Sequence, residues 1–110
     1  MASERIGSAD SVPPGEVRVL RCASGRELAV SNIDGTLFAI DDVCTHDGGT
    51  LGEGRLRNGR VICPRHGAAF DARTGKVLSL PAVKSVRSYP VTVEDGEIYV
   101  DMDPPFEVPR

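Results

Sequence analysis

Two short clusters of cysteine and histidine constrain this chain more than any other feature. The first reads Cys-Thr-His at 44–46, and the second, after sixteen intervening residues, reads Cys-Pro-Arg-His at 63–66. Thiolates and imidazoles together suit zinc or an iron–sulfur centre. Zinc fingers more often place both cysteines in one knuckle and both histidines on a helix. Two mixed pairs are expected when one iron takes both cysteines and a second iron takes both histidines. The predicted metal ligands are therefore Cys44, His46, Cys63 and His66.

The two clusters and their flanks resemble the Rieske [2Fe–2S] family, and within it the small low-potential Rieske-type ferredoxins. The resemblance runs from about residue 4 to residue 101 and rests mainly on Cys-Thr-His-Asp-Gly-Gly at 44–49 and Cys-Pro-Arg-His-Gly at 63–67. Phe70-Asp71 and Thr74-Gly75 fit the same pattern, and Leu80-Pro81-Ala82 resembles the proline loop that covers the cluster. The resemblance implies one [2Fe–2S] cluster per chain, held by these four ligands.

The sequence departs from the high-potential branch of that family in two ways. That branch carries an additional cysteine in each cluster loop, whereas the matching positions here are Gly49 and Arg65. It also often has a serine that donates a hydrogen bond to a bridging sulfide, whereas this chain has Ala68. Fewer hydrogen bonds to the sulfurs leave the reduced cluster less stabilised. We therefore expect a midpoint potential on the order of −150 mV.

The ligand set also determines which chemistry is expected. Two ferric ions, two sulfides, two thiolates and two neutral imidazoles carry no net formal charge, so one electron is accepted more easily than by an all-cysteine cluster. The outer nitrogens of exposed His46 and His66 would titrate, so the potential should fall as the pH rises through their pKa values. Both histidines of the chain are used in this assignment, which leaves none for a mononuclear oxygenase centre or a Ser/His triad. No dinucleotide-binding fingerprint is present either, so the chain is predicted not to be an enzyme.

Length and composition fit one small domain that spans residues 1–110. The chain lacks an apolar run of about eighteen residues, so no membrane span is expected. It also lacks an apolar signal core at its start, which favours the cytoplasm. With two of its three cysteines assigned to metal, Cys22 remains alone, and a disulfide framework is excluded. We expect Cys22 to be a small, half-buried strand residue.

Short apolar runs separated by turn residues predict an all-β fold. Strands are expected at 16–22, 27–30, 36–40, 61–62, 68–70, 89–93 and 97–100, with a loop at 8–15 and turns at Asp34-Gly35 and Glu94-Asp95-Gly96. Such a pattern favours a sandwich or small barrel. The family resemblance implies an antiparallel three-sheet sandwich in which a cluster-binding subdomain, about residues 43–83, is inserted between strands of the base.

Charge is distributed unevenly along the chain, although the net charge is only −3. Residues 1–54 sum to −5, residues 55–85 to +6 and residues 86–110 to −4, as counted along the sequence. The basic segment holds the second cluster, where Arg65 either is an ordinary solvated residue or helps to orient a partner. The overall acidic balance and the absence of basic–aromatic interleaving argue against nucleic-acid binding.

The family resemblance implies a role as a monomeric electron carrier in a multicomponent oxygenase. An NAD(P)H-dependent flavoprotein reductase would donate single electrons, and a terminal non-haem iron oxygenase that hydroxylates aromatic rings would receive them. One alternative is the small Rieske subunit of an assimilatory nitrite reductase, whose members often lack ligands that this chain keeps. A second is a structural zinc module that mediates protein contacts, because four such ligands could also close a tetrahedral zinc site. A third, an orphan redox or regulatory adaptor, is not separated from the electron carrier by the sequence.

Overall fold

Three antiparallel sheets make up the computed structural model of the chain, which describes residues 3–23, 25–42, 50–64, 67–78 and 85–101. Sheet A has the order β1-β10-β9, sheet B the order β2-β3-β4-β8, and sheet C the order β5-β6-β7. The strands are β1 Ser3–Ser8, β2 Val17–Arg21, β3 Glu27–Ile33, β4 Thr36–Asp41, β5 Arg55–Arg57, β6 Arg60–Ile62, β7 Ala69–Asp71, β8 Ser88–Tyr89, β9 Val91–Glu94 and β10 Glu97–Asp101. The predicted all-β, three-sheet architecture is confirmed.

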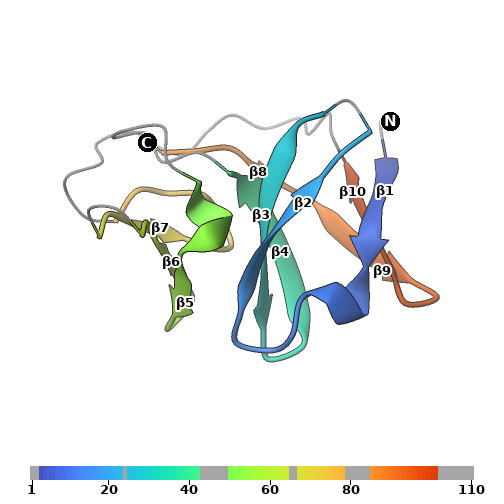
Figure 1. Cartoon of the computed structure of the whole chain (residues 1–110), viewed down its shortest axis with the longest axis horizontal. Coiled ribbons are helices and arrows are strands. Elements are labelled where there is room, and N and C mark those ends of the chain that lie inside the picture. Colours follow the sequence, from blue (N-terminus) through green and yellow to red (C-terminus); the bar gives the residue numbers. More distant parts are fainter. Residues whose placement is uncertain (1–2, 24, 43–49, 65–66, 79–84, 102–110) are drawn as a thin grey trace.

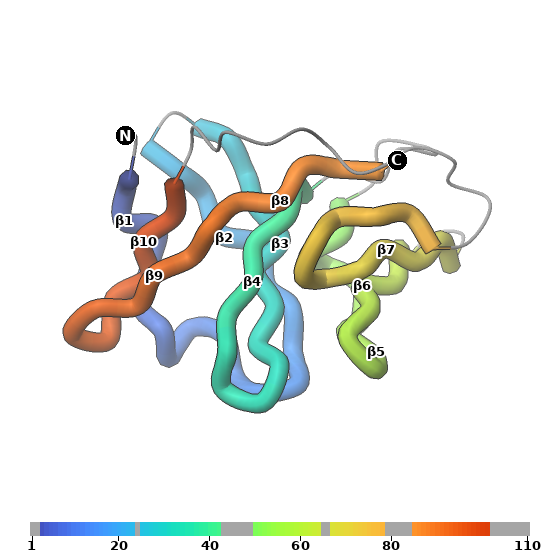
Figure 2. The backbone as a smooth tube through the Cα atoms, turned by 180° about the vertical axis from the view of Figure 1, so that it is seen from behind, coloured from blue at the N-terminus to red at the C-terminus, as the bar shows by residue number. Residues whose placement is uncertain are grey.

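Sheet B lies between the other two sheets (Figures 1 and 2). Its two faces are buried in two separate apolar clusters, which explains why five consecutive residues of β3 are buried. Leu28 and Val30 face sheet A, whereas Ala29 packs with residues of sheet C such as Val61 and Phe70. Successive strand residues point to opposite faces, so one strand contributes to both clusters.

Three tight hairpins have the same two-residue turn. The first turn residue is Asp34, Asn58 or Asp95, with φ values of 52°, 52° and 51°, and a glycine with positive φ follows each of them. Positive φ at both central positions is the type I′ geometry that joins twisted strands. The turns predicted at Asp34-Gly35 and Asp95-Gly96 are confirmed. The Asn58-Gly59 turn between β5 and β6 carries the same signal but was not predicted.

Several strand boundaries differ from those expected. β1 was not predicted, and β5 was also missed, while the loop at 8–15 contains a short 3-10 helix, η1 Ala9–Ser11. The single strand expected at 89–93 is two strands, because Tyr89 pairs with β4 of sheet B and Val91 pairs with β10 of sheet A. Pro90 lies at this crossing, where its missing N–H interrupts no ladder.

Sheet C packs against sheet B, and a cation–π contact just beyond β7 also reaches sheet B. A second 3-10 helix, η2 Leu51–Glu53, leads into β5, and its Leu51 is fully buried against the core between the two sheets. Beyond β7, the guanidinium of Arg73 lies 5.7 Å from the centre of the Phe38 ring on β4. Both 3-10 helices consist of three residues, so among the described residues none forms a helix that could cross a membrane.

Candidate metal centre

Cys63 is the one predicted ligand that the structure describes; Cys44, His46 and His66 lie outside the described residues. The same is true of Gly49, Arg65 and the expected proline loop at 80–82. The complete ligand set therefore remains a prediction. The geometry of the site follows from Cys63 and from the strand ends that flank the other three ligands.

Cys63 follows directly after β6 and begins a closed turn. Its backbone N–H donates to the carbonyl of Ala68 at 2.8 Å, and the N–H of Gly67 donates to the carbonyl of Cys63 at 3.1 Å. Gly67 has φ +76°, a conformation that favours glycine. These two hydrogen bonds join described residues on either side of positions 65–66 and connect the end of β6 to the chain just before β7.

The side chain of Cys63 is only 1% exposed and packs in the apolar cluster between sheets B and C. It forms no disulfide, and it lines a cavity of about 350 Å³. The other lining residues are Glu53, Gly54, Arg55, Ile62, Pro64 and Gly67. A thiolate buried in apolar surroundings requires a compensating charge, which an iron ion provides. A buried thiol beside a cavity is thus a donor that fits an iron–sulfur group.

Asp42 is the last described residue before the first cluster. Its Oδ1 accepts a hydrogen bond of 2.5 Å from the N–H of Gly52, so the chain just before residue 43 is tied to η2. Burial raises the pKa of Asp42, and the charges of Glu27 and Glu53 act in the same direction, while the Gly52 hydrogen bond opposes them. Its Oδ2 has no hydrogen-bond partner among the described residues. A β-carbon on Gly52 would overlap the Val19 side chain, so the close approach requires glycine.

A second polar network joins the strand ends that flank residues 43–49 and 79–84. The hydroxyl of Tyr89 donates to Asp41 Oδ1 at 2.6 Å and accepts a hydrogen bond of 2.6 Å from Arg26. Asp41 and Arg87 also exchange two hydrogen bonds, one through the Asp41 N–H and one through its carboxylate. Burial raises the pKa of Tyr89 to about 12, with a smaller contribution from Asp41. These hydrogen bonds hold the end of β4, which precedes residues 43–49, next to the start of β8, which follows residues 79–84.

These positioning residues were not identified from the sequence. Asp41 and Tyr89 are 48 positions apart, and Arg26 and Tyr89 are 63 positions apart. No local spacing rule links residues at such separations. The one local signal that could have been used was the pair of acidic residues, Asp41 and Asp42, immediately before the first cluster.

Comparison with known proteins places these features among iron–sulfur proteins. The family model described as the Rieske [2Fe–2S] domain matches residues 3–90. The 3-phenylpropionate/cinnamic acid dioxygenase ferredoxin subunit of Photorhabdus laumondii is 40% identical over 96 residues, which cover 86% of this chain and 90% of that protein. The ferredoxin component of the p-cumate 2,3-dioxygenase system of Pseudomonas putida is 42% identical over 94 residues, which cover 84% of this chain and 80% of that protein.

Solved structures agree with the sequence comparisons. The ferredoxin of Sphingomonas yanoikuyae B1 has a TM-score of 0.85 and 35% identity, and the match covers 92% of this chain and 99% of that one. A chain in a complex of reduced oxygenase and oxidized ferredoxin in carbazole 1,9a-dioxygenase also has a TM-score of 0.85, with 31% identity and coverage of 96% and 97%. The similarity therefore extends over nearly the whole length of both compared chains.

Proposed function

Since the chain belongs to the Rieske [2Fe–2S] family, we propose that it carries single electrons from an NAD(P)H-dependent flavoprotein reductase to a terminal non-haem iron oxygenase that hydroxylates aromatic rings. One observation carries the proposal: relatives at 40% and 42% identity, matched along most of their own length, are ferredoxin components of dioxygenase systems. The chain is accordingly an electron-transfer component and not a catalytic subunit. The same similarity favours the oxygenase role over a nitrite reductase subunit, and the family match argues against the zinc module.

The family implies a Rieske-type [2Fe–2S] cluster, which takes up and releases one electron at a time when bound. We assign Cys44 and Cys63 to one iron and His46 and His66 to the other, within a cluster-binding subdomain of about residues 43–83 in a single domain. The burial of Cys63 supports this assignment, because it excludes water from the thiolate. We further propose that the chain acts as a monomer in the cytoplasm, where an NAD(P)H-dependent reductase would find its substrate.

The proposal is tested by reconstituting electron transfer from purified components. The protein should be coloured, should show a rhombic EPR signal after reduction with dithionite, and should have a midpoint potential on the order of −150 mV. Addition of NADH, a flavoprotein reductase and a terminal oxygenase from the same organism should give hydroxylated product only when this chain is present. A colourless protein without that EPR signal would contradict the cluster, whereas a coloured protein that the reductase cannot reduce would contradict the partner.

Ala68 offers a test of what sets the potential. Its side chain is fully buried in the same apolar cluster as Cys63, and its carbonyl accepts the hydrogen bond of the Cys63 N–H. In Ala68→Ser, the new hydroxyl is expected to donate to a cluster sulfur and to stabilise the reduced form by about 1 kcal/mol. For a one-electron couple this corresponds to a rise of about 40 mV in the midpoint potential, which a redox titration followed by EPR would measure.

The control for this variant is Ala72→Ser. Ala72 is equally buried in the same cluster, but its N–H donates to Gly59 and it lies outside the turn that begins at Cys63. This substitution introduces the same buried hydroxyl and should leave the potential unchanged. Equal potentials for Ala68→Ser and the unmodified protein would remove the missing serine hydroxyl as an explanation of the low potential.

A further inference from the structure

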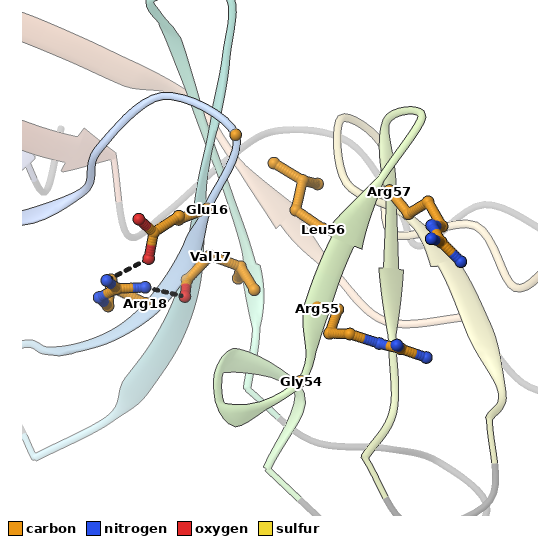
Figure 3. Close-up of a pocket in the computed structure, with 8 residues that line it drawn as sticks. Glu16, Val17, Arg18, Gly54, Arg55, Leu56 and Arg57 are labelled. Carbon is orange, nitrogen blue, oxygen red and sulfur yellow. Dashed lines mark hydrogen bonds and ion pairs between the residues drawn. The ribbon is translucent and has the colours of Figure 1, made fainter.

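Sheet C has two chemically different faces. Leu56, Val61 and Phe70 face sheet B and contribute to the core. Arg55 and Arg57 occupy the alternate positions of β5 and therefore point the other way. Figure 3 shows Leu56 directed toward Val17 on β2, while Arg55 and Arg57 extend from the opposite side of β5. We call the exposed surface formed by Arg55, Arg57 and Arg60 the arginine face.

The arginine face carries one acidic side chain among its arginines. Arg57 and Arg60 are directly opposite in the register of β5 and β6, which is destabilising for like charges, whereas Arg60 is also directly opposite Asp71 of β7, which is a favourable pairing. Among the described residues, no carboxylate lies within ion-pair distance of Arg55, Arg57 or Arg60. On sheets A and B, by contrast, three exposed arginines each pair with a glutamate; they are Arg5, Arg18 and Arg21.

One end of this face, at Arg55, borders the candidate metal centre, whereas Arg57 and Arg60 lie at the turn end of the β5–β6 hairpin. Arg55 and Ile62 are register partners, and both line the cavity of about 350 Å³ that also contains Cys63. Acidic side chains are placed differently: Glu94, Asp95 and Glu97 belong to the β9–β10 hairpin of sheet A, on the other side of sheet B (Figures 1 and 2). Glu53 lines the same cavity and Asp71 lies opposite Arg60, so the strands of sheet C keep an excess of positive charge, although the net charge of the chain is −3.

We propose that the arginine face docks an acidic surface of the protein that receives the electron, which under the proposed function is the terminal oxygenase. The argument is charge complementarity: three guanidinium groups that have no carboxylate at ion-pair distance among the described residues, with Arg55 lining the cavity of Cys63, would attract and orient a negatively charged surface. Each planar guanidinium can also bind a carboxylate through two parallel hydrogen bonds. The inference rests on the proposed function for the partner's identity, but the chemistry that recognises the partner is that of Arg55, Arg57 and Arg60.

A kinetic experiment with small oxidants tests the sign of the local field. The reduced holoprotein passes one electron to ferricyanide, which becomes ferrocyanide, or to the cationic tris(phenanthroline)cobalt(III), which becomes the cobalt(II) complex. The negative net charge of the protein alone predicts that salt accelerates the ferricyanide reaction by screening repulsion. The arginine face predicts the opposite, namely that ferricyanide reacts fastest at low salt and the cobalt complex reacts slowest there. Acceleration of the ferricyanide reaction by salt would overturn the proposal.

Two variants with the same net charge locate the effect. At an ionic strength of 0.01 M, Arg55→Gln/Arg57→Gln/Arg60→Gln should slow the ferricyanide reaction about tenfold, and the difference should vanish at about 0.5 M. Arg5→Gln/Arg18→Gln/Arg21→Gln removes three ion-paired charges from sheets A and B and should have less than a twofold effect. Equal slowing by both triple variants would assign the effect to net charge and overturn the proposal.

A titration that requires no electron separates this inference from the proposed function. The probe is a fluorescein-labelled peptide of twelve glutamates, followed by anisotropy at low salt. It should bind the unmodified protein and the Arg5/Arg18/Arg21 variant similarly, and the arginine-face variant at least fivefold more weakly. Loss of binding confined to the arginine-face variant supports the docking surface even if the oxygenase proves to be the wrong partner. If a DNA oligonucleotide of twelve nucleotides bound the unmodified protein more tightly than the glutamate peptide does, this face would be assigned to nucleic acid and the proposal would be overturned.

Discussion

Cys63→Ser is expected to yield a protein without visible colour and without the rhombic EPR signal after reduction. The side chain of Cys63 is 1% exposed and lies beside the cavity at the end of β6, where its thiolate would ligate an iron. A serine hydroxyl is a much poorer ligand for this soft site. Iron content should fall at least tenfold, and reduction by the flavoprotein reductase should be lost. Iron and sulfide analysis together with EPR spectroscopy would measure these losses.

Cys22→Ser is the matched control for this prediction. Cys22 was expected to be a half-buried strand residue, but it follows the end of β2 and is only 3% exposed, in the other apolar cluster between sheets A and B. Burial raises the pKa of its thiol, with a further contribution from Glu4, so this cysteine is held in the protonated form. Both substitutions bury a hydroxyl in an apolar cluster, but only Cys63→Ser removes a predicted ligand. Cys22→Ser should therefore keep full colour and an unchanged potential, and a bleached Cys22→Ser protein would show that the ligand assignment is wrong.

The parts of the fold that could be predicted from the sequence are those determined by neighbouring residues. Asp34-Gly35 and Asp95-Gly96 have turn geometry that depends on two residues alone, and both turns are confirmed. The break at Pro90 could not be predicted in the same way, because it depends on which sheet each neighbouring residue joins. β1 was missed because its stability comes from pairing with β10, about ninety residues away, and not from its own polar composition.

The candidate site shows the same division between local and long-range information. The four ligands stay a prediction from two short motifs, made because thiolate and imidazole side chains in this pattern indicate a metal without knowledge of the fold. The contacts that position the strand ends beside these motifs could not be predicted from the sequence. Asp41, Tyr89 and Arg26 meet because β4 and β8 pair, and no property of these residue types indicates that pairing. The arginine face likewise depends on the Arg57–Arg60 register, which follows from the Asn58-Gly59 turn.

Gly54→Ala is expected to cause a large loss of stability. A β-carbon at position 54 would overlap the carbonyl oxygen of Ile62 and lie 3.0 Å from its carbonyl carbon. The obstacle is backbone and not a flexible side chain, so β5 and β6 must separate immediately before Cys63. We expect a loss of at least about 3 kcal/mol in the free energy of unfolding. Thermal unfolding of the holoprotein should show a melting temperature at least about 10 °C lower, together with faster loss of iron.

Gly7→Ala separates this effect from the general consequence of adding a methyl group. Gly7 lies in β1, and a β-carbon there would meet its nearest atoms, from Leu20 and Ser11, at 3.6–3.8 Å, which are ordinary contact distances. Its melting temperature should stay within about 3 °C of the unmodified protein, because alanine also restricts the unfolded chain. If Gly54→Ala matched Gly7→Ala in both melting temperature and iron retention, β5 would not be held against Ile62 as described. The close approach of these two backbones would then have no part in holding Cys63 beside its cavity.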